Sequence, residues 1–127
     1  MSRHDLPGQF VDRKTILFTT YRRDGRPVGT PVSIAVKGGR LFIRSYKESG
    51  KAKRIRNNPL VDAAPSTFRG KPLGSTVRMR AILLDGDAAR LASRLIVRQH
   101  RMLHGFLVPT LHRLLRHTTI YYELIPV

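Results

Sequence analysis

The sequence predicts a mainly β fold, a small antiparallel barrel of the α+β or all-β class. Most of its regular segments are short, alternate apolar with polar residues, and are separated by turn-forming residues, which is typical of antiparallel strands. Two stretches change to a helical period instead. A chain of 127 residues without an internal repeat or a linker has room for one core. We therefore expect one domain over residues 1–127, with six strands and short helical insertions.

The first three strands are predicted to form a meander. Thr15–Tyr21 is rich in β-branched and aromatic residues, as expected of a strand. Asp24-Gly25 makes a turn into the second strand, Val28–Val36, and Gly38-Gly39 makes a tight turn into the third, Leu41–Tyr46. Strands joined by turns this short are expected to pair with each other in sequence order.

The second strand combines a regular alternation with a proline. Alternate positions place apolar or semi-apolar side chains on one face: Val28, Thr30, Val32, Ile34 and Val36. Pro31 lies between them and cannot donate a ladder hydrogen bond. Either the strand lies at an edge or is bulged there, or a flat ligand lies against this backbone in place of a neighbouring strand. The residues alone leave both interpretations open.

The middle of the chain is predicted to contain one helix and two more strands. Ser49–Asn58 begins with a capping serine and is followed by a proline, which indicates a short helix. Leu60–Ala64 is predicted as a short strand and Phe68–Gly74 as a loop rich in Gly and Pro. The fifth strand is predicted over Val77–Asp85, where apolar residues alternate with outward-facing arginines.

The C-terminal third is predicted to be helical until the last strand. A helix is expected over Asp87–Leu103, a second helical piece over Thr110–His117, and the final strand over Thr118–Ile125. In the long helix we expect two opposite faces. The apolar face contains Leu91, Leu95 and Met102, and the basic face contains Arg90, Arg94, Arg98 and Arg101.

The charge balance narrows the possible partners. Lys and Arg number 24 against 8 Asp and Glu, which gives a net charge of +16. A polyanion is therefore expected as a partner: a nucleic acid, an anionic membrane or a multiply charged cofactor. The absence of cysteine excludes disulfides, a thiolate nucleophile and zinc fingers. No secretory signal and no apolar run of about 20 residues is present, so we expect a cytoplasmic protein without a membrane span.

A phosphate site is indicated where the third strand is followed by the first helix. Unpaired backbone N–H groups at a helix N-terminus attract anions, and hydroxyl and cationic side chains beside them add donors. The alternative is a capping serine followed by a solvated basic helix face. The candidate residues are Arg44, Ser45, Ser49, Gly50, Lys51 and Arg54.

Other candidate chemistry has less support. His100 and His104 have the spacing of a metal pair on a helix, but no acidic third ligand lies near them in the sequence, so we expect no metal site. No G-x-S-x-G, Walker or Rossmann motif is present. The arginine stripe is either a contact surface for nucleic-acid phosphates or a solvated face, and nucleic-acid binding is the less favoured of the two. The stripe comprises Arg90, Arg94, Arg98 and Arg101, with Arg113 and Arg116 further on.

Three segments together resemble the flavin and deazaflavin split-barrel superfamily, which is similar to pyridoxamine 5'-phosphate oxidase. They are TILFTTYRRDGRPVGTPVSIAV, GGRLFIRSYKESGKAKRIRNNPLVDAAP and FRGKPLGSTVRMRAILL. The resemblance covers residues 15–85 and is most similar to the members that depend on coenzyme F420. It implies a six-stranded antiparallel split barrel of the FMN-binding type. One departure is Ser33, at a position that is often aromatic in this group.

The resemblance also implies where a cofactor binds. The tricyclic ring would lie against the second-strand backbone at Thr30, Pro31 and Val32. The cofactor phosphate would be held by Arg44, Ser45, Ser49, Gly50, Lys51 and, less directly, Arg54. Members are homodimers with cofactor sites at the subunit interface, so the loop Phe68–Gly74 is expected to complete a partner's site.

The predicted function is hydride transfer between coenzyme F420 and a small organic substrate, with FMN as the alternative cofactor. Coenzyme F420 carries a phosphodiester and an oligoglutamate tail, which a strongly basic chain complements. Because the cofactor performs the transfer, we assign no catalytic side chain. Two other hypotheses remain: a basic nucleic-acid-binding module without activity, and a cofactor-binding split barrel that acts as a carrier or sensor.

Overall fold

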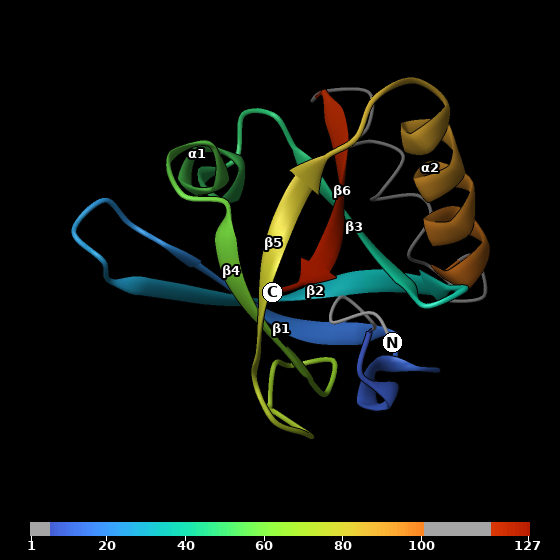
Figure 1. Cartoon of the computed structure of the whole chain (residues 1–127), viewed down its shortest axis with the longest axis horizontal. Coiled ribbons are helices and arrows are strands. Elements are labelled where there is room, and N and C mark those ends of the chain that lie inside the picture. The colour runs from blue at the N-terminus through green and yellow to red at the C-terminus, as the bar shows by residue number, and fades with distance from the viewer. Residues whose placement is uncertain (1–5, 101–117) are drawn as a thin grey trace.

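The computed structural model describes residues 6–100 and 118–127, whose six strands form a closed barrel (Figure 1). Around the barrel the strands follow the order β1-β2-β3-β6-β5-β4, and every neighbouring pair is antiparallel. The strands are β1 (Thr15–Tyr21), β2 (Pro27–Lys37), β3 (Arg40–Tyr46), β4 (Leu60–Pro65), β5 (Val77–Leu83) and β6 (Thr119–Pro126). The helices are the short 3-10 helix η1 (Gly8–Phe10), α1 (Gly50–Asn57) and α2 (Gly86–His100).

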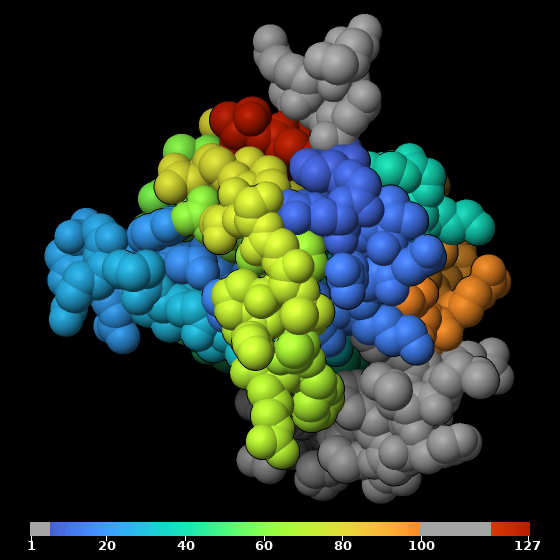
Figure 2. Space-filling model, turned by 90° about the horizontal axis from the view of Figure 1, so that it is seen from below, coloured from blue at the N-terminus to red at the C-terminus, as the bar shows by residue number. Residues whose placement is uncertain are grey.

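The predicted elements are confirmed within about two residues at most ends. The fifth strand, predicted to reach Asp85, ends at Leu83 because the chain turns at Gly86, where φ is +53°, to begin α2. The predicted helical piece Thr110–His117 lies outside the described residues. Figure 2 shows the hairpin of β1 and β2 projecting from the body of the barrel.

The barrel interior is filled by alternate side chains of all six strands. Pairs such as Ile16 with Val32 and Ile34 with Ile43 face inward, as the alternation in the second strand predicts. Phe18 is fully buried among them and adds a large apolar area to the interior. This interior is the main core of the described residues.

Helical segments close the barrel ends. Phe10 of η1 and Ile55 of α1 both belong to the buried core cluster. The first lies just before the Thr15 end of β1, whereas α1 contacts the Thr20 end through Arg54. Figure 1 shows α1 and η1 on opposite sides of the barrel. The position of α1 matters most for function because its N-terminus lies at the site described below.

The second helix, α2, covers the outer face of β2, β3 and β6. Its buried side chains, Ala92 and Ile96, pack against Ala35 and Phe42. The predicted leucine face is half-buried and the arginines are exposed, but the two faces adjoin rather than lie on opposite sides. Leu91 and Leu95 border the same pocket as Arg94 and Arg98, because residues three apart are neighbours on a helix surface. No helix of the described residues is long and apolar enough to cross a membrane.

A polar clamp joins three strands on the outer face. Tyr21 of β1 donates its hydroxyl to Asp62 of β4, and Arg78 of β5 donates to the other oxygen of the same carboxylate at 2.7 Å. The Arg78 guanidinium also lies 5.5 Å from the centre of the Tyr21 ring. The bond to Asp62, then burial, raises the pKa of Tyr21 above its ordinary value of 10.0. The clamp therefore depends on protonated Tyr21.

We expect Tyr21→Phe to lower the free energy of unfolding by about 1 kcal/mol at pH 7, the typical net value of an intramolecular hydrogen bond. Because the folded-state pKa is raised, this contribution is complete below pH 10.0 and is lost as the pH rises through the raised value. Urea unfolding at several pH values measures it. In an Asp62→Ala background the same substitution should cost little, and an equal cost in both backgrounds would contradict the clamp.

Candidate functional site

The candidate site lies where β3 separates from β2. These strands pair only from Ile34 with Ile43 to Lys37 with Arg40, at the turn end of their hairpin. On its other edge β3 pairs with β6 over its whole length, from Leu41 with Leu124 to Tyr46 with Thr119, so beyond Ile43 β6 is its strand partner. Among residues 6–100 and 118–127, no strand pairs with the edge of β2 that precedes Ile34 and faces away from β1. Backbone groups along this edge therefore make no ladder bond to a described strand.

Pro31 lies on this open edge. The N–H of Ile34 donates to the Lys14 carbonyl, next to β1, at 3.0 Å. Hydrogen-bonded and non-hydrogen-bonded pairs alternate in an antiparallel ladder, so the nitrogen of Pro31, three residues earlier, points away from β1. The proline therefore costs no ladder bond. The position of Pro31 at a strand edge is the simpler of the two interpretations given above and explains the proline by itself. A flat ligand bound against this backbone would need the same unpaired edge.

The N-terminus of α1 lies beside the gap. Ser49 caps the helix, and its hydroxyl accepts from the Ala52 N–H at 3.0 Å. The hydroxyl of Ser45, at the end of β3, lies 3.0 Å from that of Ser49. Both hydroxyls can turn a lone pair or a proton toward a ligand. The predicted capping serine is confirmed, and Ser45 is brought against it.

Lys51 reaches from α1 across to β2. The only hydrogen bond that the described residues offer its ammonium is to the Thr30 hydroxyl, at the long distance of 3.5 Å. Burial, and next the positive charge of Arg54, lower the pKa of Lys51 below its ordinary value of 10.5. The side chain is half-buried and has no anionic partner among those residues, and an anion bound beside it would favour its charged form.

Arg54 folds back over the start of α1. Its Nε donates to Thr20 at 2.6 Å, and Thr20 is fully buried. A Cβ added at Gly50 would lie 2.9 Å from one Arg54 terminal nitrogen, so glycine leaves room for the guanidinium above the helix N-terminus. Thr20 was not among the predicted site residues. The sequence does contain a signal for it, because Thr20 is a polar residue at the next inward position of β1 after the apolar Ile16 and Phe18.

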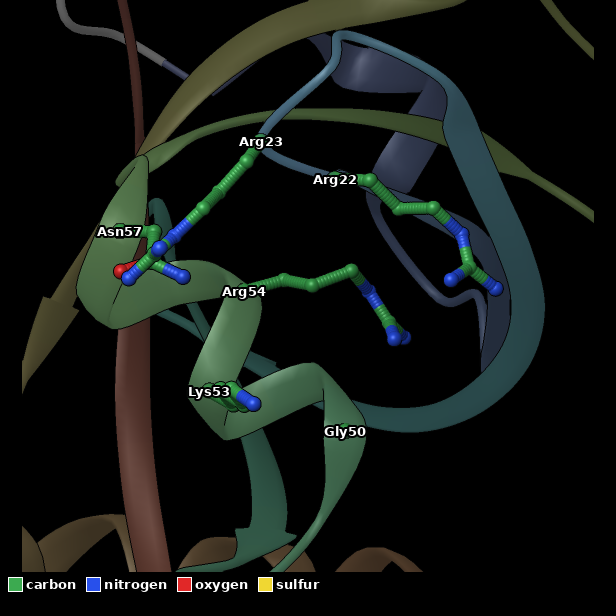
Figure 3. A pocket seen from close by; sticks show the side chains of 6 residues that line it. All are labelled: Arg22, Arg23, Gly50, Lys53, Arg54 and Asn57. Carbon is green, nitrogen blue, oxygen red and sulfur yellow. The ribbon is translucent and has the colours of Figure 1, made fainter.

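A cationic pocket of about 320 Å³ opens beside this guanidinium. In Figure 3 the side chains of Arg22 and Arg54 extend from the hairpin and from α1 toward the same space, and Arg23 extends toward Asn57. The sequence analysis did not include Arg22 and Arg23 in the site, because the sequence does not show that the β1–β2 turn lies next to α1. No acidic side chain lines the pocket, whose described lining residues are Arg22, Arg23, Gly50, Lys53, Arg54 and Asn57.

Six of the nine predicted site residues are linked by contacts around the gap, and the side chains of the other three point elsewhere. Thr30, Ser45, Ser49, Gly50, Lys51 and Arg54 are linked by the contacts given above. Arg44 lies on the opposite face of β3 from Ser45, because successive strand residues alternate. Val32 faces the core, and the outward ring of Pro31 lies near the β4–β5 loop, where a Cβ at Gly70 would be 3.6 Å from it.

Solved structures with a similar fold have little sequence identity to this chain. A candidate pyridoxamine 5'-phosphate oxidase of Listeria innocua is 17% identical with a TM-score of 0.63, over 89% of this chain and 83% of that one. A candidate 5-nitroimidazole antibiotic resistance protein of Bacteroides thetaiotaomicron is 14% identical with a TM-score of 0.67, over 93% and 75%. This chain is a split barrel of the pyridoxamine 5'-phosphate oxidase-like type. The fold that the resemblance implied is thereby confirmed.

A third solved split barrel is named for a different ligand. The heme storage protein HutZ of Vibrio cholerae is 20% identical to this chain with a TM-score of 0.63, over 91% of this chain and 83% of that one. No protein-family model and no curated sequence matches significantly. The fold alone therefore does not choose a ligand, and the choice depends on the chemistry of the site.

The donor set of this split barrel fits a phosphate-bearing cofactor. Two hydroxyls, a helix N-terminus and two cations converge beside an open strand edge. No group of three or more His, Asp or Glu side chains that could hold a metal gathers in the part of the chain that the structure describes. His104, Arg101, Arg113 and Arg116 lie outside that part.

We expect Ser49→Ala to lower the free energy of unfolding by about 1 kcal/mol, because the Ala52 N–H loses its cap. Ser45→Ala is the matched control, since the Ser45 hydroxyl contacts that of Ser49 but caps no backbone group of the described residues. Thermal or urea unfolding of both variants measures the difference. Equal stability of Ser49→Ala and wild type would show that the helix does not depend on this cap.

Proposed function

We infer that this split barrel binds a phosphate-bearing flavin-type cofactor, coenzyme F420 or alternatively FMN, and acts as an oxidoreductase on a small organic substrate. The half-buried Lys51 ammonium carries the proposal. It lies at a helix N-terminus, beside the open edge of β2, and lacks an anionic partner among the described residues. Burying a cation without a partner is unfavourable, and a bound anion removes that cost.

The same residues suggest how a cofactor would be held. Ser45, Ser49 and Lys51 would bind the phosphate, together with the free N–H groups at the start of α1. The backbone of Thr30–Val32 would support the ring through the open edge of β2. When bound, a flavin or deazaflavin supplies hydride transfer. The chain's own residues bind and orient, and the barrel wall excludes water from one side.

The cationic pocket favours coenzyme F420 over FMN. Its lining contains Arg22, Arg23, Lys53 and Arg54 and no acidic side chain among the described residues, which complements the oligoglutamate tail that FMN lacks. The neighbouring phosphate donors would bind either cofactor. Comparing the two cofactors therefore tests the pocket separately from the phosphate site.

We expect Lys51→Ala to weaken binding of coenzyme F420 and of FMN by about tenfold or more, because a charge-assisted hydrogen bond is worth about 1.5–3 kcal/mol. Fluorescence titration of purified protein measures both affinities. Ser49→Asp keeps a good helix cap but adds a negative charge, so it should preserve stability and abolish binding. Unchanged dissociation constants in Lys51→Ala and Ser49→Asp would refute the phosphate assignment.

The affinity for coenzyme F420 should also depend on pH through Lys51. Its pKa is lowered in the free protein, and a bound anion favours the charged form. We therefore expect affinity to fall as the pH rises through this lowered pKa, and the fall to disappear in Lys51→Ala. A short DNA duplex titrated in parallel should bind weakly. Tight duplex binding with no cofactor affinity would favour the nucleic-acid hypothesis instead.

We further propose that the protein is a homodimer whose shared sites include the loop Phe68–Gly74. Phe68 is 78% exposed at this loop and Leu73 is also exposed, so one short loop presents two large apolar side chains to solvent. A solved structure of similar fold, 17% identical with a TM-score of 0.62, is described as a domain-swapped dimer. An apolar loop beside the open edge of β2 suits a contact with a second copy.

We expect light scattering to give twice the chain mass at micromolar concentration. Phe68→Ser should shift the equilibrium toward the monomer and weaken cofactor binding, because the loop would contribute to the partner's site. Val127→Ser, at another exposed apolar position, is the control and should change neither quantity. A wild-type monomer that binds cofactor in a one-to-one ratio would contradict the shared site.

A further inference from the structure

A second pocket lies on α2, separate from the gap between β2 and β3. It has a volume of about 400 Å³, within the usual range of roughly 300–1,000 Å³ for small-molecule sites. The turn of the β2–β3 hairpin forms one wall and α2 forms the other. Its lining residues are Lys37, Gly38, Arg40, Phe42, Leu91, Arg94, Leu95 and Arg98. Figure 1 shows α2 on the opposite side of the barrel from α1.

The pocket has an apolar floor. Leu95 is half-buried and packs against the cluster beneath α2, in which Phe42 is only 1% exposed, so the accessible part of the floor comes from leucines of α2. Leu91 adds a further aliphatic surface one helical turn earlier. An apolar floor distinguishes this pocket from the one beside α1, whose described lining contains no large apolar side chain.

The rim is cationic, and its charges are unequally compensated. Arg40 makes two hydrogen bonds to Glu123, at 3.0 and 2.8 Å, and lies 5.0 Å from the centre of the Phe42 ring. The charge of Arg40 is therefore compensated by Glu123, and its guanidinium covers the Phe42 ring. Lys37, Arg94 and Arg98 make no ion pair with any residue in the described ranges 6–100 and 118–127. Three uncompensated cations therefore face one pocket.

We propose that this pocket binds a soluble amphipathic organic anion, with a flat or aliphatic body on Leu91 and Leu95 and a phosphate or carboxylate between Arg94, Arg98 and Lys37. Cations alone would suit a nucleic-acid backbone, but a phosphodiester chain offers no apolar group to the floor. The two features together match a ligand that combines both properties. The proposal does not rest on the cofactor assignment, because it involves no residue of the α1 site.

The probe for this site is 1-naphthyl phosphate, measured by isothermal titration calorimetry in Lys51→Ala as well as in wild type, because the phosphate site proposed at α1 would also bind an aryl phosphate. We expect saturable binding at one site of this type per chain. Neutral 1-naphthol has the apolar body without the anionic group, and inorganic phosphate has the anionic group without the body. Each should therefore bind at least tenfold more weakly than the probe. Inorganic phosphate binding as tightly as the probe would overturn the proposal, because the apolar floor would then contribute nothing.

Two variants test the charged and the apolar parts of the pocket separately. Arg94→Gln/Arg98→Gln removes two cations of the rim, and Leu91→Gln removes an apolar side chain of the floor. Each should weaken binding of the probe by about tenfold or more. Arg80→Gln/Arg90→Gln removes the same number of charges from exposed positions outside the pocket and is the matched control. An equal loss of affinity in this control would show that binding depends only on the net charge of the protein, and it would overturn the proposed site.

Two further measurements distinguish this pocket from the α1 site and from a lipid-binding surface. Lys51→Ala should keep one binding site for the probe that depends on Arg94 and Arg98, and loss of all binding in this variant would assign the ligand to α1 and overturn the proposal. Vesicles of phosphatidylcholine with phosphatidic acid should not displace the probe, because the pocket is sized for a small molecule. Displacement by these vesicles would assign the cations to lipid headgroups and overturn the assignment to a soluble ligand.

Discussion

The separation of β3 from β2 after the Ile34–Ile43 pair determines how the rest of the molecule is arranged. If the two strands stayed paired, the edge of β2 would be satisfied by backbone hydrogen bonds and the end of the barrel would close. Because β3 leaves β2 and pairs only with β6 beyond Ile43, α1 covers that end, and two inward threonines, Thr20 and Thr30, accept from the helix's cations Arg54 and Lys51. The covering helix thereby places positive charge at its N-terminus, beside the unpaired edge of β2.

Local sequence was sufficient for the elements of this fold. Alternation in β2, the glycine turn before β3 and the capping Ser49 each act within a few residues, so they determine strands and helix ends before any long-range contact forms. The meander follows from short turns. Closure by β6 between β3 and β5 is a pairing of distant segments, and the resemblance, rather than any local pattern, implied the split barrel.

The candidate site was predicted only where its residues are close in sequence. Ser45, Ser49 and Lys51 are neighbours along the chain, and their contacts follow from one helix start. Thr20 and Arg22 join them through the β1–β2 hairpin, and nothing in their own segment reveals α1 as the neighbour. Arg44 shows the opposite error, because closeness in sequence suggested a shared site and strand alternation separates it from Ser45. In α2, leucines and arginines three residues apart were assigned to opposite faces although they share one pocket.

The large positive charge is not one surface. Four acidic side chains, those of Asp24, Asp62, Asp87 and Glu123, form structural ion pairs with arginines on strands, at a turn and at a helix start. Other cations gather in two pockets with different floors, one beside backbone and hydroxyl groups at α1 and one beside Leu91 and Leu95 of α2. Salt screens exposed charges over about 8–10 Å, so each pocket attracts anions mainly through its own side chains. Two anionic ligands of different chemistry are therefore compatible with one basic chain, and selectivity between them comes from the floors rather than from net charge.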